Sequence, residues 1–377
     1  MSMSLETMTV RELRADIPAL QEGSYLNFGA HGPSPRYVID AMHAFLEQHE
    51  YDVVGQDPYE HAFETYEDAR SAIATFIGAE SHEIALTEST TDGVNRIAQA
   101  IDWEPGDVVV RTDLEHPAGI LPWQQLAQQG VEVRVLETSN GRVDRDAFAE
   151  AVVDARLVFF SSITWTHGTR LPVRELVDIA HDAGALTFVD AVQSPGQREM
   201  DVHSWGADAV AAAGHKWLLG PWGAGFLYID GTLADQLTPG AIGYRSVETP
   251  TDPEITYTPG APRFELGSSN PAPHVGLMEA IDTISEVGLP TIEQRIERLT
   301  DRLKDGLGDD RLLSPRAFES GLVTVRDETP EETVEELANE HIVIRPLPFP
   351  NAVRVSVHAV TTEHDVDRVV NGLTRSA

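Results

Sequence analysis

The sequence of 377 residues contains no cysteine and only two lysines, Lys216 and Lys304. Without cysteine these residues cannot form a disulfide, a cysteine-ligated zinc site, an iron–sulfur cluster or a thiol nucleophile. Basic residues are scarce as well, because 27 Lys and Arg stand against 61 Asp and Glu, which gives a formal net charge of -34. A surface this acidic repels nucleic-acid phosphates and anionic lipids, so we expect neither as a partner.

Long apolar runs are also missing from the sequence. No run approaches the roughly 18 residues that a membrane span needs, and the first 14 residues do not have the pattern of a signal peptide. We therefore expect a cytoplasmic protein without a membrane partner. The acidic residues are spread from Glu6 to Asp367, which favours a whole surface adapted to high salt, as in a halophile, over an acidic tail or partner-binding patch.

The hydrophobic content and the pattern of apolar residues predict an α/β fold. Hydrophobic residues make up 41% of the chain, enough for a sizeable core, and the length suits a large domain with a smaller one. Short runs rich in Val, Ile and Phe alternate with amphipathic stretches such as 91–101 and 173–182, which predicts a mainly parallel seven-stranded sheet between helices. The predicted strands are 83–87, 107–111, 131–136, 157–161, 185–190, 207–213 and 225–229.

The last third of the chain predicts a smaller α/β domain. Residues 250–273 are rich in Pro, Gly and Thr and are typical of a connection between lobes. A mixture of helices (291–307, 331–340, 363–373) and strands (321–325, 341–345, 352–357) follows them. We expect an N-terminal segment 1–22 that packs on the small domain, a large domain over 23–255 and a small C-terminal domain over 256–377.

Lys216 stands among small and apolar residues, in the segment Ala213–Pro221. One interpretation is a lysine whose stem covers apolar surface. This chain uses Arg almost everywhere, however, and only an amine can lose its proton and attack a carbonyl, since a guanidinium stays charged. A lysine that forms a Schiff base is the alternative, and both interpretations stay open on this segment alone.

Three other polar features lie at or just after the ends of predicted strands, at the sheet edge where α/β proteins bind ligands. Asp190 either caps a helix or pairs with a protonated ring nitrogen. Segment 87–93 is either an ordinary helix cap or a phosphate site. His116 is either structural or stacks on a planar cofactor. The other histidines lack metal-binding spacing, so we expect no metal site.

Together these segments resemble the class V aminotransferase family, whose fold-type-I pyridoxal-phosphate (PLP) enzymes include cysteine desulfurases, selenocysteine lyases and isopenicillin-N-epimerase-like proteins. The resemblance runs from residue 25 to residue 356. It implies PLP as the cofactor, an amino acid as the small-molecule substrate and a homodimer. It also implies that Lys216 forms the Schiff base, that Asp190 pairs with the pyridinium nitrogen and that His116 stacks on the ring.

The resemblance implies further contacts to cofactor and substrate. Gln193 matches the residue that donates a hydrogen bond to the ring oxygen O3′. The residues that match phosphate contacts are Thr90, Thr91, His215 and Ser268. Either Ser268 or Ser269 reaches that phosphate from the second subunit. Arg354 matches the arginine that binds the substrate α-carboxylate through a bidentate fork. We expect His31 and Trp165 in the same substrate pocket.

The segment 344–351 departs from the desulfurases of the family, which carry a catalytic cysteine on a loop at this place. It is short, rich in proline and lacks cysteine, and Trp165 stands near an asparagine of those enzymes. We therefore expect an aminotransferase rather than a cysteine desulfurase, with a PLP-dependent lyase or epimerase as the runner-up. A PLP-fold protein used for binding or regulation is a rival. So is a nucleotide-binding enzyme, which the missing GxGxxG turn disfavours.

Overall fold

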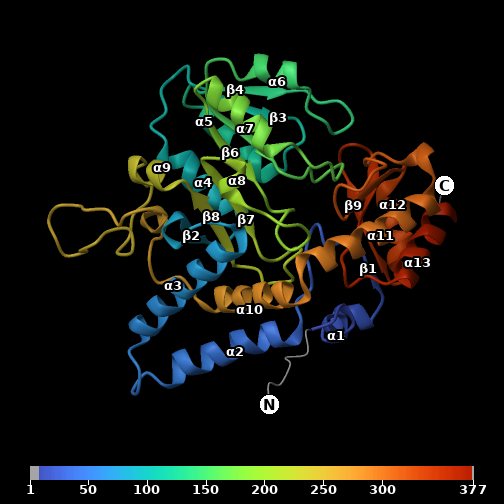
Figure 1. The fold of residues 1–377 in the computed structure, drawn as a ribbon, viewed down its shortest axis with the longest axis horizontal. Helices are drawn as coiled ribbons and strands as arrows, with labels where there is room; N and C mark the ends of the chain where they lie inside the picture. Colours follow the sequence, from blue (N-terminus) through green and yellow to red (C-terminus); the bar gives the residue numbers. More distant parts are fainter. Residues whose placement is uncertain (1–7, 376–377) are drawn as a thin grey trace.

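The computed structural model describes residues 8–375 and is built around one large sheet (Figure 1). Its seven strands follow the order β2-β8-β7-β6-β5-β3-β4, in which β8 runs antiparallel to both neighbours and β3 to β7 run parallel. They are β2 (Ile84–Thr87), β3 (Val108–Thr112), β4 (Glu132–Leu136), β5 (Ala155–Ser161), β6 (Leu186–Asp190), β7 (Ala209–Ala213) and β8 (Gly225–Ile229). The predicted α/β fold with a mainly parallel seven-stranded sheet is confirmed.

Helices cover both faces of this sheet. Successive side chains of a buried strand point to opposite faces, so each strand contributes to a hydrophobic core on both sides of the sheet. In β5, Val158 and Phe160 belong to one hydrophobic cluster, and Leu157 and Phe159 belong to the other. The first cluster includes α3 (Pro58–Ile77), α6 (Arg145–Ala151), α7 (Val173–Asp182) and α10 (Ala272–Val287). The second includes α4 (Thr90–Ala100), α5 (Leu121–Ala127) and α9 (Gly231–Gln236).

A smaller lobe carries the C-terminal strands and helices (Figure 1). It contains a three-stranded antiparallel sheet in the order β11-β12-β9 and a parallel pair, β1 with β10. Its elements are β1 (Ser24–Tyr25), β9 (Leu322–Arg326), α12 (Pro330–Asn339), β10 (Ile342–Val343), β11 (Arg345–Leu347), β12 (Ala352–Ser356) and α13 (Glu363–Arg375). The one strand predicted over 341–345 is therefore wrong: the chain changes sheets at Ile344.

The long helix α11 (Leu289–Leu307) joins the two lobes. Its first half contributes Ile292 and Ile296 to the core of the large sheet, and its second half contributes Leu299 and Leu303 to the core of the small lobe. Helix α2 (Arg36–Tyr51) lies along α10, and the short helices α1 (Val10–Ala15) and α8 (Val202–Trp205) complete the set. Between residues 8 and 375, no helix has both the length and the apolar character that crossing a membrane requires.

Candidate active site

The parallel strands bring the predicted pair Asp190 and Lys216 to the same edge of the sheet. Asp190 is the last residue of β6, and Lys216 follows the end of the neighbouring strand β7 by three residues. The two side chains are close enough for their charges to interact, since Asp190 raises the pKa of Lys216 and Lys216 lowers that of Asp190. Two residues 26 positions apart therefore face one site.

Burial makes Lys216 an unusually weak base. Removal from water disfavours the ammonium form and lowers the pKa of Lys216 to about 7, and the positive charges of Arg354 and Arg345 act in the same direction. The carboxylate of Asp190 opposes this effect. A substantial fraction of Lys216 is therefore a neutral amine, the nucleophilic form, near neutral pH.

Asp190 is a buried carboxyl group with a free oxygen. Its Oδ1 accepts a hydrogen bond from the Val192 backbone N–H at 2.9 Å, and burial raises its pKa above the ordinary value. Its Oδ2 accepts no hydrogen bond from any residue between 8 and 375. A protonated ring nitrogen placed against Oδ2 would supply both the missing donor and a compensating positive charge.

A second buried carboxyl group, Glu115, lies close enough to Asp190 for their charges to interact. Glu115 accepts hydrogen bonds from the hydroxyls of Thr112 at 2.5 Å and Ser161 at 2.6 Å, and Ser161 is the register partner of Asp190. Burial raises the pKa of Glu115 to about 7, with a smaller contribution from the charge of Asp190. Glu115 thus ties the carboxyl ends of β3 and β5 together directly before His116.

His116 is held in its neutral form. Its Nδ1 accepts a hydrogen bond from the Ala118 N–H at 3.3 Å. Burial, assisted by the charges of Lys216, Arg345 and Arg354, lowers the pKa of His116 to about 4. The indole of Trp165 meets the imidazole edge-on at 5.2 Å between ring centroids. The ring is therefore an uncharged surface that can lie against a planar cofactor.

Both polar groups of the Gln193 side chain form hydrogen bonds within the protein. Its Nε2 donates to the Gly29 carbonyl at 2.9 Å, and its Oε1 accepts from the Trp217 indole N–H at 2.8 Å. These bonds tie the turn that carries Lys216 to the N-terminal segment. The amide Nε2 carries a second N–H, so Gln193 can donate to a cofactor oxygen while both of these bonds remain.

The two predicted phosphate-loop threonines lie in different surroundings. Thr90 is the first residue of α4, and its Oγ1 is buried without a hydrogen-bond partner among the described residues. A phosphate oxygen at this helix N-terminus would satisfy it. Thr91 is exposed on the same helix.

His215 and His31 lie on either side of Trp222, which the sequence did not single out. The His215 ring is 5.5 Å from the Trp222 ring, and the His31 Nδ1 accepts from the Trp222 indole N–H at 2.8 Å. Burial lowers the pKa of His215 to about 4 and also lowers that of His31. Burial therefore favours the neutral form of both imidazoles.

Arg354 is a buried cation with unused donors. It is 1% exposed, and its Nη1 donates to the Trp165 carbonyl at 2.9 Å. Its Nε and Nη2 are buried without an acceptor among the described residues. The Ser356 hydroxyl and the side-chain oxygen of Asn27, which needs a donor, are also buried without a partner there. Residues 27 and 356 are paired in a β-bridge. Such unsatisfied groups are costly, so this pocket suits a carboxylate.

Arg345 is the main site residue that the sequence did not reveal. It lies opposite Arg354 in the β11–β12 pairing, and its charge lowers the pKa of Lys216, His116 and Arg354. No carboxylate of the described chain forms an ion pair with it. The hairpin could have suggested this pairing, but the prolines at 346, 348 and 350 hide the strand pattern.

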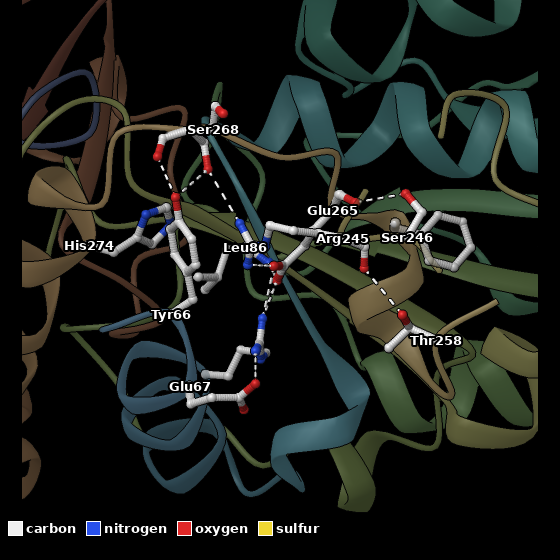
Figure 2. A network of polar contacts seen from close by, with 12 residues as sticks. Tyr66, Glu67, Leu86, Arg245, Ser246, Thr258, Glu265, Ser268 and His274 are labelled. Carbon is white, nitrogen blue, oxygen red and sulfur yellow. Dashed lines mark hydrogen bonds and ion pairs between the residues drawn. The ribbon is translucent and has the colours of Figure 1, made fainter. Parts of the chain in front are cut away.

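Ser268 lies on an exposed loop that makes no hydrogen bond to Lys216, Asp190 or Thr90 within residues 8–375. Figure 2 shows this loop beside a network in which Glu265 binds Arg245, Arg70 and the Leu86 backbone N–H. The structure therefore brings Lys216, Asp190, His116, Trp165 and Arg354 together, and leaves Ser268 at the surface.

Comparison with known proteins gives a consistent result. The family model "Aminotransferase class-V" matches residues 24–369. A protein of Methanothermobacter thermautotrophicus named "Probable cysteine desulfurase" is 35% identical over 301 residues, which cover 78% of this chain and 75% of that protein.

Solved structures extend the similarity to the whole fold. The apo structure of a cysteine desulfurase from Thermococcus onnurineus NA1 has a TM-score of 0.89 at 29% identity and covers 99% of this chain and 98% of its own. A lysine-to-alanine mutant of C-DES, with glycine covalently linked to its PLP cofactor, has a TM-score of 0.91 at 26% identity and covers 97% and 99%.

These relatives overturn the expectation of an aminotransferase in preference to a cysteine desulfurase. That expectation rested on one missing side chain in segment 344–351, whereas the similarity to proteins named cysteine desulfurases extends over most of the chain. A missing cysteine restricts where sulfur can be transferred, and it does not bear on whether a carbon–sulfur bond is cleaved. The expected preference was therefore wrong.

The low pKa of Lys216 predicts the pH dependence of its reactivity in the cofactor-free protein. Since only the neutral amine reacts with fluorodinitrobenzene, labelling of Lys216 should rise with pH to a plateau, with a midpoint near pH 7. Asp190→Asn removes the charge that raises this pKa, so its midpoint should be lower. Peptide mapping separates Lys216 from Lys304, the other lysine of the chain. A midpoint at the ordinary lysine pKa would contradict the burial argument.

Proposed function

This chain belongs to the class V aminotransferase family of PLP-dependent enzymes, and from that premise we propose that it removes sulfur from a cysteine-type amino acid. The similarity to proteins named cysteine desulfurases carries this proposal. The buried set of Lys216, Asp190, His116 and Arg354 supports it, because a non-catalytic PLP-fold protein would have no need of a lysine with a lowered pKa.

The described residues fit the cofactor. Lys216 is the amine that binds it covalently, Asp190 offers a free Oδ2 to its ring nitrogen, and the buried hydroxyl of Thr90 is a donor for its phosphate. His116 covers the ring, and Thr91, Gln193, His215 and Ser268 are further cofactor contacts in this proposal. When bound, PLP supplies an electron-withdrawing ring that stabilises negative charge at the substrate Cα.

Arg354 orients the substrate by its carboxylate. Its free Nε and Nη2 groups form a fork that binds two carboxylate oxygens. In this proposal the neutral amine of Lys216 moves the Cα proton. His31 and Trp165 complete the substrate pocket in this proposal, and Arg345 adds positive charge beside Arg354.

The sulfur must go to an acceptor outside these 377 residues, because they contain no cysteine. In the proposed reaction an external thiolate attacks the substrate sulfur and forms a persulfide. The electron pair of the carbon–sulfur bond stays with Cβ, which takes up a proton. L-cysteine and a thiol thus become L-alanine and the persulfide of that thiol, with no net oxidation.

Product analysis tests this reaction. At limiting L-cysteine, alanine formation by the PLP-loaded protein should increase with dithiothreitol concentration and saturate, and the sulfur should appear as persulfide or sulfide. Lys216→Ala serves as the control for the reaction of free PLP with cysteine. Pyruvate and ammonia in place of alanine would show elimination and contradict sulfur transfer. Conversion of bound PLP to its amine form would reinstate transamination.

Arg354→Lys should raise the KM for L-cysteine at least about tenfold, because lysine keeps the charge but loses the fork of two charge-assisted hydrogen bonds. The matched control is Arg326→Lys at the exposed end of β9, which should leave KM unchanged. Equal KM values for the wild-type and Arg354→Lys proteins would remove Arg354 from carboxylate binding.

We further propose that the active protein is a homodimer. Tyr59, Phe63, Tyr244 and Leu266 are large hydrophobic side chains that are 61%, 41%, 37% and 43% exposed. The first three line an open cavity of about 410 Å³ together with Ser268. Apolar surface of this kind, adjoining a polar loop that makes no hydrogen bond to Lys216 within residues 8–375, suits a second copy.

Mixing Lys216→Ala with Ser268→Ala chains, at a PLP concentration too low to saturate the Ser268→Ala homodimer, tests whether Ser268 serves the other subunit. A heterodimer of Lys216→Ala and Ser268→Ala chains has both lesions in one site, and its other site is intact. Mixed and re-equilibrated variants should therefore recover tight PLP binding and activity in about half the sites of each heterodimer. If Ser268 served its own subunit, every site would carry one lesion and no recovery would occur.

A further inference from the structure

Ser268 has a backbone conformation that needs outside support. Its φ is +33°, in the left-handed region that residues other than glycine rarely adopt, and the residue is exposed. Exposure means that burial of its own side chain does not stabilise this conformation. The neighbouring side chains must hold it, and strained residues held in this way are concentrated at functional sites.

The phenol of Tyr244 holds Ser268 directly. Its oxygen accepts a hydrogen bond from the Ser268 backbone N–H at 2.7 Å and lies 3.0 Å from the Ser268 Oγ. The ring packs on the adjacent Gly267, where an added Cβ would lie 2.5 Å from the Tyr244 Cε1. A hydrogen bond from the Arg245 N–H to the Leu266 carbonyl at 3.2 Å aligns the two segments.

A charged network fixes the base of this loop (Figure 2). Arg245 forms an ion pair with Glu265, which also accepts two hydrogen bonds from Arg70 at 2.8 and 2.9 Å. The Arg245 guanidinium lies 3.5 Å from the ring centroid of Tyr66. The Tyr66 hydroxyl donates to the Ser269 carbonyl. The loop is therefore fixed before any ligand binds.

We propose that Tyr244 is a positioning residue that presents the Ser268 hydroxyl to the cofactor phosphate of a second copy. The inference rests on the dimer of the proposed function and adds a residue to it. When Ser268 donates its proton to a phosphate oxygen, the Tyr244 O–H donates to the Ser268 Oγ and still accepts the Ser268 N–H. Hydrogen bonds linked in this way polarise and strengthen one another.

Equilibrium binding of PLP to the dimer tests the proposal without an activity assay. Tyr244→Phe keeps the ring and removes only the hydroxyl, so the PLP dissociation constant should rise about three- to tenfold, as for one lost hydrogen bond. Tyr257→Phe is the matched control, because the Tyr257 hydroxyl makes no hydrogen bond within the described chain. It should leave the dissociation constant unchanged.

A double-mutant cycle separates positioning from a general loosening of the fold. Ser268→Ala should raise the dissociation constant by a similar or larger factor, and adding Tyr244→Phe to Ser268→Ala should raise it no further, because Tyr244 acts through Ser268. In the cofactor-free dimer, Tyr244→Phe should also speed hydrogen exchange of the peptide around residues 266–270.

Three different results would overturn the inference. If Ser268→Ala weakens PLP binding and Tyr244→Phe does not, the dimeric site of the proposed function stands and the role of Tyr244 is wrong. If the effects of the two substitutions multiply, Tyr244 acts independently of Ser268, which also contradicts positioning. A monomer that binds PLP as tightly as the dimer would instead remove the dimeric premise, and the inference with it.

Discussion

The removal of charge from water at the carboxyl edge of the large sheet is the constraint on which the site depends. Burial favours the neutral forms of both Lys216 and Asp190, and each charge favours the charged form of the other. Arg354 adds a buried cation with donors that no described group accepts. Such an arrangement is costly in isolation. A ring nitrogen at Asp190 and a carboxylate at Arg354 would supply the missing partners. The unpaired groups thus lower the stability of the free protein and favour binding of these two ligand groups.

The sequence was sufficient for the parts of the fold that repeat a simple pattern. Runs of Val, Ile and Phe predicted the seven strands, and the geometry of parallel strands then placed Asp190 and Lys216 at one edge. Arg345 and Tyr244 could not be found in this way. Arg345 reaches the site through a hairpin masked by prolines, and Tyr244 lies beside Ser268 because two irregular segments happen to pair. Neither pairing has a local sequence signature.

The error about the reaction has a related cause. The segment 344–351 lacks one side chain that the resemblance led us to expect, and that absence was taken to bear on the whole reaction. In the proposed function the groups that activate Cα lie at the end of β6, just after β7 and on β12, and they do not depend on a thiol in the segment between β11 and β12. A chemical step is lost only when the residues that perform it are lost. In the proposed reaction the missing cysteine bears on the last step, the transfer of sulfur, and not on the residues proposed to activate the substrate.

The acidic surface gives the cations of the site a second role. A net charge of -34 repels an anion such as the cofactor phosphate at long range, and this field does not attract an amino acid whose two charges cancel. Attraction must come from cations close to the site, and Arg345 and Arg354 are such cations, set side by side on paired strands. Salt shortens the range of the surface repulsion, but it screens buried charges much less. In concentrated salt, therefore, the surface repulsion that opposes entry weakens more than the attraction that holds the bound carboxylate. Electrostatic recognition in this protein thus depends on charges within the site.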